Sequence, residues 1–264
     1  TDPFETLATY GPDATRWYMI SNANPWDNLK FDVDGIDEVK RKFFGTLYNT
    51  YAFFTLYANI DRFDRSEPAI PHEQRPEIDR WILSELHTLI ENVDGHYANY
   101  EPTKAAREIS KFTQELLSNW YVRLSRRRFW KGAYENDKIS AYQTLFTCML
   151  TLSKLGAPIA PFFMDRLYLD LVTPTKLELH DSVHLSEFPN SNIQLIDKAL
   201  EYKMAQAQLI SSLVLSLRAK EKIKVRQPLN KILIPFKGLD EKNEILEIED
   251  FIKSEINVKK VELI

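Results

Sequence analysis

The chain has 264 residues, of which 44% are hydrophobic and 27% charged, and these averages exclude a disordered or fibrous protein. Glycine is scarce at 7 residues whereas aromatic residues make up 12%, which disfavours glycine-dependent phosphate loops and turn-rich β architectures. No apolar run reaches the roughly 18 residues that a membrane helix requires. The one cysteine, Cys148, has no partner for an internal disulfide and lies in an apolar run, which fits a reducing compartment.

The net charge of −4 conceals a strong segregation of sign along the chain. Residues 102–132 contain eight Lys or Arg against two acidic residues, and residues 218–237 contain seven against one. Residues 238–264 then carry eight acidic residues and four lysines. Such segregation indicates local charged surfaces in an otherwise nearly neutral protein.

The first 34 residues predict short elements. Asp2-Pro3 is typical of a helix start, and Gly11-Pro12 must end that helix. A second short helix follows and stops near Asn22. From Ile36 to about Ile60, apolar residues recur three and four positions apart, which predicts one long helix with a buried face.

Three further stretches show the same spacing. They cover about 77–94, 101–124 with the basic segment beyond it, and 137–155, and the last resumes over 162–171. Gly95 is expected to end the first of them, and Pro158 and Pro161 are expected to break the last. Four long helices joined mostly by short links predict an antiparallel bundle.

The sequence from residue 173 onward no longer shows a purely helical pattern. Residues 173–189 are expected to be irregular, with room for a small hairpin, and 194–222 are expected to be helical. Two β-branched runs, 231–235 and 258–264, flank a predicted helix over 241–255. We therefore predict a mainly α fold, an antiparallel helical bundle with a small C-terminal α+β module. Its expected parts are residues 1–34, 35–190 and 191–264.

Motifs of the common enzyme classes are missing. The sequence has no Walker, dinucleotide-binding, nucleophile-elbow or zinc-protease pattern. His180 and His184 come closest to a metal-ligand pair, but no cysteine or well-placed third ligand lies near them. We expect no metal site and no catalytic residue in this chain.

The most informative segment runs from Leu117 to Lys131. At helical spacing, one stripe is apolar and a second stripe is formed by Asn119, Arg123, Arg126 and Trp130. Guanidinium groups bind phosphates in two-point geometry, and arginines and aromatic rings stack on exposed bases, so this mixture suits a splayed RNA loop. The alternative is a solvated charged face on which Trp130 packs locally.

Residues 220–226 form a second basic strip at a helix-to-strand junction, and Gln227 follows it. The strip could hold phosphates, or it could be a charged edge that prevents a strand from pairing with other chains.

Leu117 to Trp130 resembles the signature of the anticodon-binding region of isoleucyl-tRNA synthetases, in the branch shared by eukaryotes, archaea and some bacteria. There a Trp-Tyr dipeptide leads into an arginine cluster that ends in Phe-Trp. Further landmarks of this class I group resemble residues 2–4 after the KMSKS loop, 11–18 in the stem-contact segment, 79–84 at the start of the anticodon domain, 157–162 and 226–229. Leu124 departs from the pattern, because some members carry a basic residue there.

The resemblance implies a portion of an enzyme that charges isoleucine tRNA using ATP and Mg. Its Rossmann catalytic domain and inserted editing domain would precede Thr1 in the same cytoplasmic polypeptide, so we expect this chain alone to be inactive, without a cofactor of its own. The expected partner is the anticodon arm of tRNA-Ile, and no membrane. Residues 1–34 would touch the inner stem of the tRNA.

The expected tRNA-binding residues are Asn119, Arg123, Arg126, Arg127, Arg128, Trp130, Lys131, Lys224, Arg226 and Gln227. Within the 117–131 segment, the arginines and the lysine would hold phosphates, and Trp130 would stack on an unpaired base. Two alternatives remain open: the same region of a valyl-tRNA synthetase, or a helical protein-interaction scaffold whose arginines pair with an acidic partner.

Overall fold

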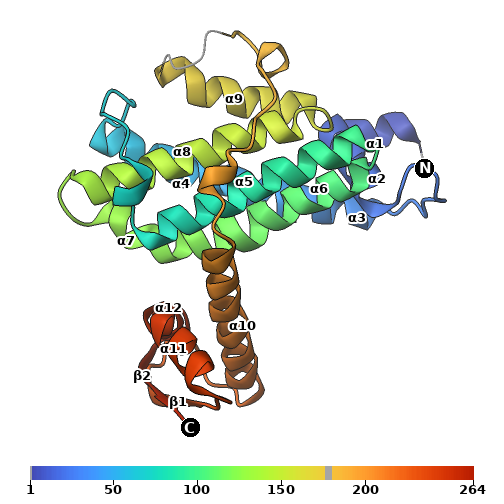
Figure 1. The fold of residues 1–264 in the computed structure, drawn as a ribbon. Helices are drawn as coiled ribbons and strands as arrows, with labels where there is room; N and C mark the ends of the chain where they lie inside the picture. Colours follow the sequence, from blue (N-terminus) through green and yellow to red (C-terminus); the bar gives the residue numbers. More distant parts are fainter. Residues whose placement is uncertain (1, 176–179) are drawn as a thin grey trace. The chain divides into compact units, whose positions relative to one another are not determined.

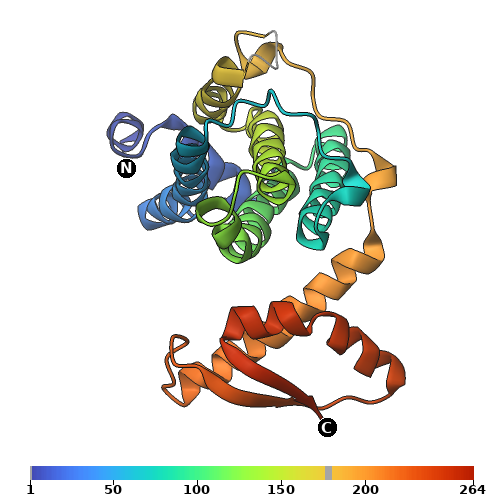
Figure 2. The same ribbon diagram turned by 90° about the vertical axis from the view of Figure 1, so that its left-hand side faces the viewer.

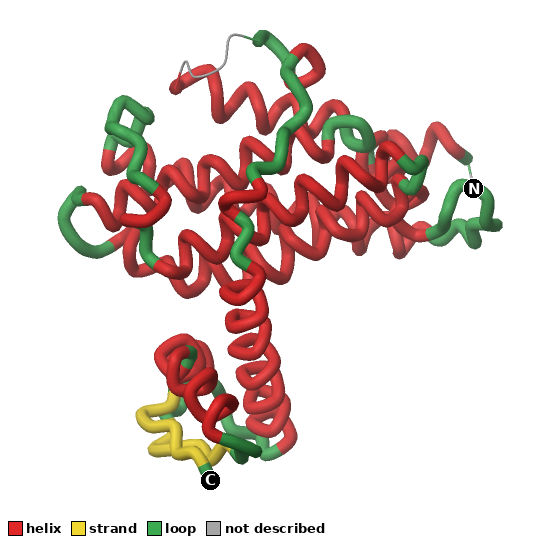
Figure 3. Tube along the Cα trace, viewed as in Figure 1, coloured by secondary structure: helices red, strands yellow, loops and turns green. Residues whose placement is uncertain are grey.

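The computed structural model describes residues 2–175 and 180–264, and helices dominate it (Figure 1, Figure 3). The chain divides into two compact units, Thr1–Ile196 and Asp197–Ile264. This division has two parts where the sequence predicted three, and its boundary falls between 196 and 197. We describe each unit by itself.

The first unit begins with a helical corner. Helix α1 (Pro3–Tyr10) is capped by Asp2, whose Oδ1 accepts a hydrogen bond of 2.7 Å from the Phe4 N–H. Gly11 has φ of 85°, a left-handed conformation that favours glycine, and it joins α1 to α2 (Pro12–Asn22). The predicted short helices are therefore present.

The predicted long helix over 36–60 is confirmed as one continuous helical run with a change of pitch. It consists of α3 (Val33–Val39), the π-helical turn η1 (Lys40–Phe44) and α4 (Gly45–Asp61). Its beginning packs on α2, where the Trp17 ring stacks on Phe43 at 4.2 Å between centroids. This aromatic contact explains why residues 1–34 belong to the first unit.

The other bundle helices follow the predicted order. They are α5 (Glu77–Ala98), the continuous run α6 (Pro102–Lys111), η3 (Phe112–Val122) and α7 (Arg123–Trp130), then α8 (Asn136–Gly156) and α9 (Pro161–Thr175). The break before α9 is confirmed. Gly95 does not end α5, because the helix continues to Ala98 and the chain turns at Tyr100, which has φ of 58°.

The helical runs 33–61, 77–98, 102–130 and 136–156 pack around a common core, and Figure 2 views the bundle nearly end-on. Helix α5 packs against α6, η3 and α8, and α4 packs against η3 and α8. Trp81, Leu117 and Leu145 are fully buried at these contacts. The predicted bundle is confirmed.

The chain after α9 returns to α5 through short 3₁₀ turns, η4 (Val183–Leu185) and η5 (Ile193–Leu195), and another such turn, η2 (His72–Gln74), precedes α5. The Asn192 N–H donates to His87 Nδ1 at 3.1 Å. Burial, with the nearby His72, lowers the pKa of His87. Of the stretch 173–189 that we expected to be irregular, residues 176–179 lie outside the described residues.

The second unit is the predicted α+β module. It contains α10 (Lys198–Lys220), β1 (Leu229–Ile234), α11 (Leu239–Glu247), α12 (Glu249–Ile256) and β2 (Val258–Leu263). The two strands pair in parallel, from Leu229 opposite Val258 to Ile234 opposite Leu263. Helices α11 and α12 form the crossover that a parallel pair requires, and α12 packs on α10.

Candidate nucleic-acid interface

The arginine-rich helix α7 continues directly from the π-helical segment η3. Three consecutive residues at the end of η3 are buried: Trp120, Tyr121 and Val122 are 7%, 0% and 4% exposed. The core therefore holds this segment tightly at the point where the basic residues begin.

A buried carboxylate organises the inner side of α7. Asp79, in the first turn of α5, is fully buried and accepts a hydrogen bond of 2.8 Å from Tyr121 Oη and one of 2.6 Å from Ser140 Oγ. Arg128 Nη1 and Nη2 donate to the two Asp79 oxygens at 2.6 and 2.8 Å. This paired geometry fixes α7 against α5 and α8.

Arg128 therefore differs from the open cation that we expected. Its side chain is 14% exposed, and Nε lies 3.0 Å from an Asp137 oxygen. Although burial alone would lower the pKa of Arg128, the hydrogen bonds to Asp79 raise it far above its usual range. Because both edges of the guanidinium are engaged by carboxylates, Arg128 is not part of the open cationic surface.

The outer side of α7 is an open cationic surface, which we call the arginine face. Arg123, Arg126, Arg127 and Trp130 recur at helical spacing and are all exposed, and the exposed Lys131 follows them. Among the described residues, Arg126, Arg127 and Lys131 form no ion pair. Trp130 is 50% exposed, so one part of its indole is available for stacking.

Trp130 can face outward because the neighbouring Phe129 holds this end of α7 in the core. Phe129 is 1% exposed and lies edge-on against Phe53 and Tyr142, at 5.1 and 5.0 Å between ring centroids. Asn119, one of the expected residues, is exposed on η3. It precedes the arginine face along the same continuous helical run.

The remaining expected residues lie in the second unit. Lys224, Arg226 and Gln227 are exposed in the connection between α10 and β1. The expected tRNA-binding residues are thus divided between the two units, with seven of the ten in the segment 119–131 of the first.

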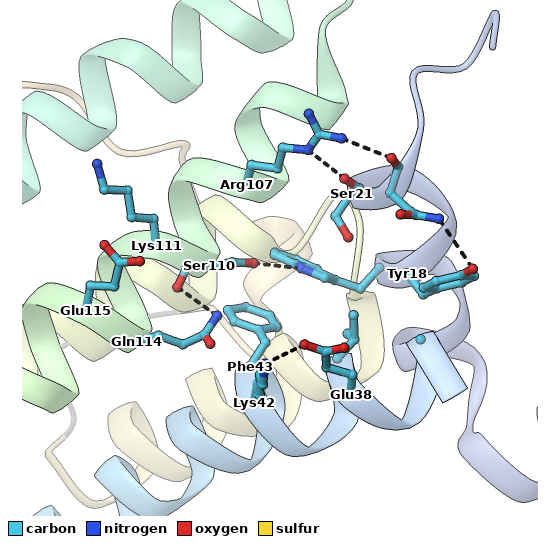
Figure 4. A pocket seen from close by; sticks show the side chains of 14 residues that line it. Tyr18, Ser21, Glu38, Lys42, Phe43, Arg107, Ser110, Lys111, Gln114 and Glu115 are labelled. Atoms are coloured by element: carbon cyan, nitrogen blue, oxygen red, sulfur yellow. Dashed lines mark hydrogen bonds and ion pairs between the residues drawn. The ribbon is translucent and has the colours of Figure 1, made fainter. Parts of the chain in front are cut away.

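Sequence reasoning missed a pocket of about 480 Å³ bounded by α2, α3, η1 and the α6–η3 run (Figure 4). Trp17 Nε1 donates to Ser110 Oγ at 3.0 Å on its wall. Arg107 donates to the carbonyl oxygens of Ser21 and Asn22 at 2.7 and 2.9 Å, so it binds the last turn of α2. These hydrogen bonds join helix α2 to the bundle, and the Arg107 guanidinium is thereby paired within its own chain.

Sequence reasoning also missed Asp79 as the partner of Arg128. A local signal existed for the inward direction of Arg128, since Tyr121, Ser125 and Arg128 recur at helical spacing and the first two are buried. The partner itself lies 49 residues away in the chain and could not be read from spacing. Among the described residues, no group of three or more His, Cys, Asp or Glu is arranged to hold a metal ion.

Comparison with known proteins identifies the domain. A family model described as the anticodon-binding domain of tRNA ligase matches residues 79–233. The chain belongs to this family. The match begins at the buried Asp79 and includes α7, all of α10 and all but the last residue of β1. Among the described residues, no helix is long and apolar enough to cross a membrane.

Curated relatives of this anticodon-binding domain are similar over the whole chain. The isoleucine–tRNA ligase of Cytophaga hutchinsonii is 59% identical over 263 residues, which are 100% of this chain and 24% of the relative. That of Bacteroides thetaiotaomicron is 57% identical over 263 residues, 100% of this chain and 23% of the relative. The chain therefore spans about a quarter of the length of these relatives.

A solved structure supports the fold. The ternary complex of LeuRS, tRNA and LeuAMS from Agrobacterium radiobacter K84 has a TM-score of 0.52 and 20% sequence identity, covering 75% of this chain and 22% of that chain. At this identity the likeness concerns the fold alone, and it agrees with the predicted helical bundle.

Proposed function

We propose that this chain is the tRNA-binding, anticodon-recognising part of an isoleucine–tRNA ligase. The observation that carries the proposal is the exposed arginine face on a helix that lies within the matched anticodon-binding domain. The identity of 59% over the whole chain to an isoleucine–tRNA ligase supports isoleucine as the amino acid of the complete enzyme.

In this proposal the arginine face holds the anticodon arm. Arg123, Arg126 and Arg127, with Lys131, hold backbone phosphates, because guanidinium and ammonium groups on one exposed surface attract consecutive phosphates. Trp130 stacks on an unpaired base of the loop. Asn119 lies on the same run, where its amide can donate to the RNA.

Arg128 has a different task in the proposal. Its bidentate pair with Asp79 holds α7 in position, so the exposed side chains project from a rigid helix. Rigid presentation lowers the entropic cost of binding because fewer side chains and backbone segments must be ordered in the complex.

The complete enzyme is proposed to charge tRNA-Ile with isoleucine in the cytoplasm, using ATP and Mg. Those steps belong to catalytic and editing domains elsewhere in the polypeptide, because this chain spans about a quarter of its relatives and carries no recognisable catalytic motif. Residues 1–34 are proposed to contact the inner tRNA stem. We expect the chain alone to bind tRNA without charging it.

The test is binding of the chain to isoleucine tRNA and to a copy with a scrambled anticodon. We expect preference for the intact anticodon, and competition with valine tRNA separates isoleucine from valine specificity. Arg127→Ala should weaken binding and flatten the slope of log affinity against log salt by about 0.7 to 0.9. Arg166→Ala is the matched control, since Arg166 is an exposed α9 residue paired with Asp170. Equal binding of the two tRNAs would contradict the proposal.

A further inference from the structure

Lys220, the last residue of α10, and the connection 221–228 that leads to β1 form a second basic surface, which we call the cationic loop. We propose that the cationic loop binds RNA backbone phosphates and that its shape is fixed by hydrogen bonds from the buried Arg218 and the half-buried Asn257. The inference rests on the proposed tRNA-binding function and adds to it a separate contact in the second unit.

Arg218 lies near the end of α10 and is 3% exposed. Its Nη2 donates to the carbonyl oxygens of Lys224 and Gln227 at 2.6 and 2.5 Å. The other two side-chain nitrogens of Arg218, Nε and Nη1, are buried and have no hydrogen-bond partner among the described residues. The buried Arg218 guanidinium therefore fixes the backbone of the loop that carries the exposed cations.

Asn257 acts on the loop from the opposite end of the unit's sequence. It lies between α12 and β2 with φ of 53°, and its Nδ2 donates to the carbonyl oxygens of Val225 and Arg226 at 3.0 and 3.3 Å. Together with Arg218, it engages all four consecutive carbonyls of residues 224–227. The partially negative carbonyls of residues 224–227 are thus all hydrogen-bonded to side chains of the same unit.

The loop presents positive groups to the outside as a consequence. Lys220, Lys222, Lys224 and Arg226 are exposed, and Glu221 is the one acidic residue among residues 220–228. In the described part of the chain none of the four cations forms an ion pair. The backbone N–H groups of residues 224–226 likewise have no acceptor there, which leaves donors beside the cations.

Most neighbouring lysines are paired, and this contrast argues against a simple solubilising edge. Lys231 pairs with Glu262 at 2.7 Å, Lys253 with Asp250 at 2.8 Å and Lys260 with Glu262 at 2.9 Å. Lys259 of β2 is also exposed and has no ion pair among the described residues, but it is a single residue, whereas the loop gathers four such cations on a backbone that is held in place. Phosphate is the matching ligand, because the anticodon-binding family model includes the loop and RNA offers a continuous row of anionic oxygens.

The test measures the affinity of the 264-residue chain for an isoleucine tRNA transcript between 50 and 200 mM salt. Lys224→Gln combined with Arg226→Gln should flatten the log–log slope by about 1.4 to 1.8, the value for two lost phosphate contacts. Lys40→Gln combined with Arg41→Gln removes the same charge from η1 and is expected to leave the slope unchanged. Equal flattening by both pairs would show a general charge effect and overturn the inference.

Positioning is tested by variants that keep every cation of the loop. Arg218→Met and Asn257→Gly each remove donors to the loop carbonyls, and both are expected to weaken binding and to flatten part of the slope. Glycine retains the left-handed conformation at 257, so this variant remains informative if Arg218→Met does not fold. Unchanged slopes in a folded Asn257→Gly protein would overturn the positioning role.

The outcomes separate this inference from the proposed function. If Arg126→Gln with Arg127→Gln flattens the slope whereas the loop variants do not, the loop inference fails alone. If neither set changes tRNA binding, both fail. Polyglutamate that displaces the tRNA from the wild-type chain but not from the loop variant would assign the loop to an acidic protein partner and overturn the RNA assignment.

Discussion

Removing the Asp79 carboxylate should destabilise the first unit severely. Asp79→Ala deletes the acceptor of four hydrogen bonds, two from Arg128 and one each from Tyr121 and Ser140. Deleting one partner of a buried ion pair costs about 3–5 kcal/mol, since the other charge stays buried. Arg128 retains the more exposed Asp137, so we expect about 3 kcal/mol, a loss of about 6–12 °C in Tm.

Urea unfolding followed by circular dichroism measures this loss. Asp170→Ala serves as the control because it breaks the exposed Arg166–Asp170 pair, for which about 0–1 kcal/mol is expected. Asp79→Ala combined with Arg128→Met should recover stability relative to Asp79→Ala, since an apolar side chain carries no unpaired charge. A loss below about 1 kcal/mol for Asp79→Ala, or no recovery in the double variant, would refute this reasoning.

Three other predictions concern single positions of the bundle. Burial raises the pKa of the Cys148 thiol, so a thiol reagent should leave the native chain unlabelled and react once urea unfolds it; rapid native labelling would contradict burial. Gly95→Ala should add about 1 kcal/mol to the free energy of unfolding, whereas Gly35→Ala should lower it, because its Cβ would lie 2.3 Å from Tyr18 Cε2; equal effects would be the contrary result. The pKa of His87 in the folded chain is lowered below the unfolded value of about 6.5, so its contribution to stability should be full above that pH and should be lost as the pH falls below it. Urea unfolding between pH 7.5 and 5 measures this loss, and His87→Gln should reduce it. An equal loss of stability in the variant would contradict the prediction.

The helices could be predicted because their apolar residues recur at helical spacing, and the β-branched runs at 231–235 and 258–264 revealed the two strands. The π-helical runs η1 and η3 could not be predicted, because the spacing of apolar residues was compared only with the α-helical period.

The candidate site was predicted in part. The exposed direction of Arg126 and Arg127 follows from local spacing, and the structure confirms their exposure. The inward direction of Arg128 depends on a carboxylate in another helix, and local patterns do not encode such long-range pairs. The same limit hid the role of Arg218, because its acceptors are backbone carbonyls of a loop and leave no trace in residue type.

The central claim is that the arginine face binds the anticodon arm, and phosphate footprinting of isoleucine tRNA tests this claim most directly. We expect the wild-type chain to protect anticodon-arm phosphates from cleavage, and Arg126→Gln with Arg127→Gln to lose that protection while its circular dichroism and Tm stay unchanged. Protection of the anticodon arm that is equally strong in this variant, or no protection of the arm by the wild-type chain, would contradict the claim.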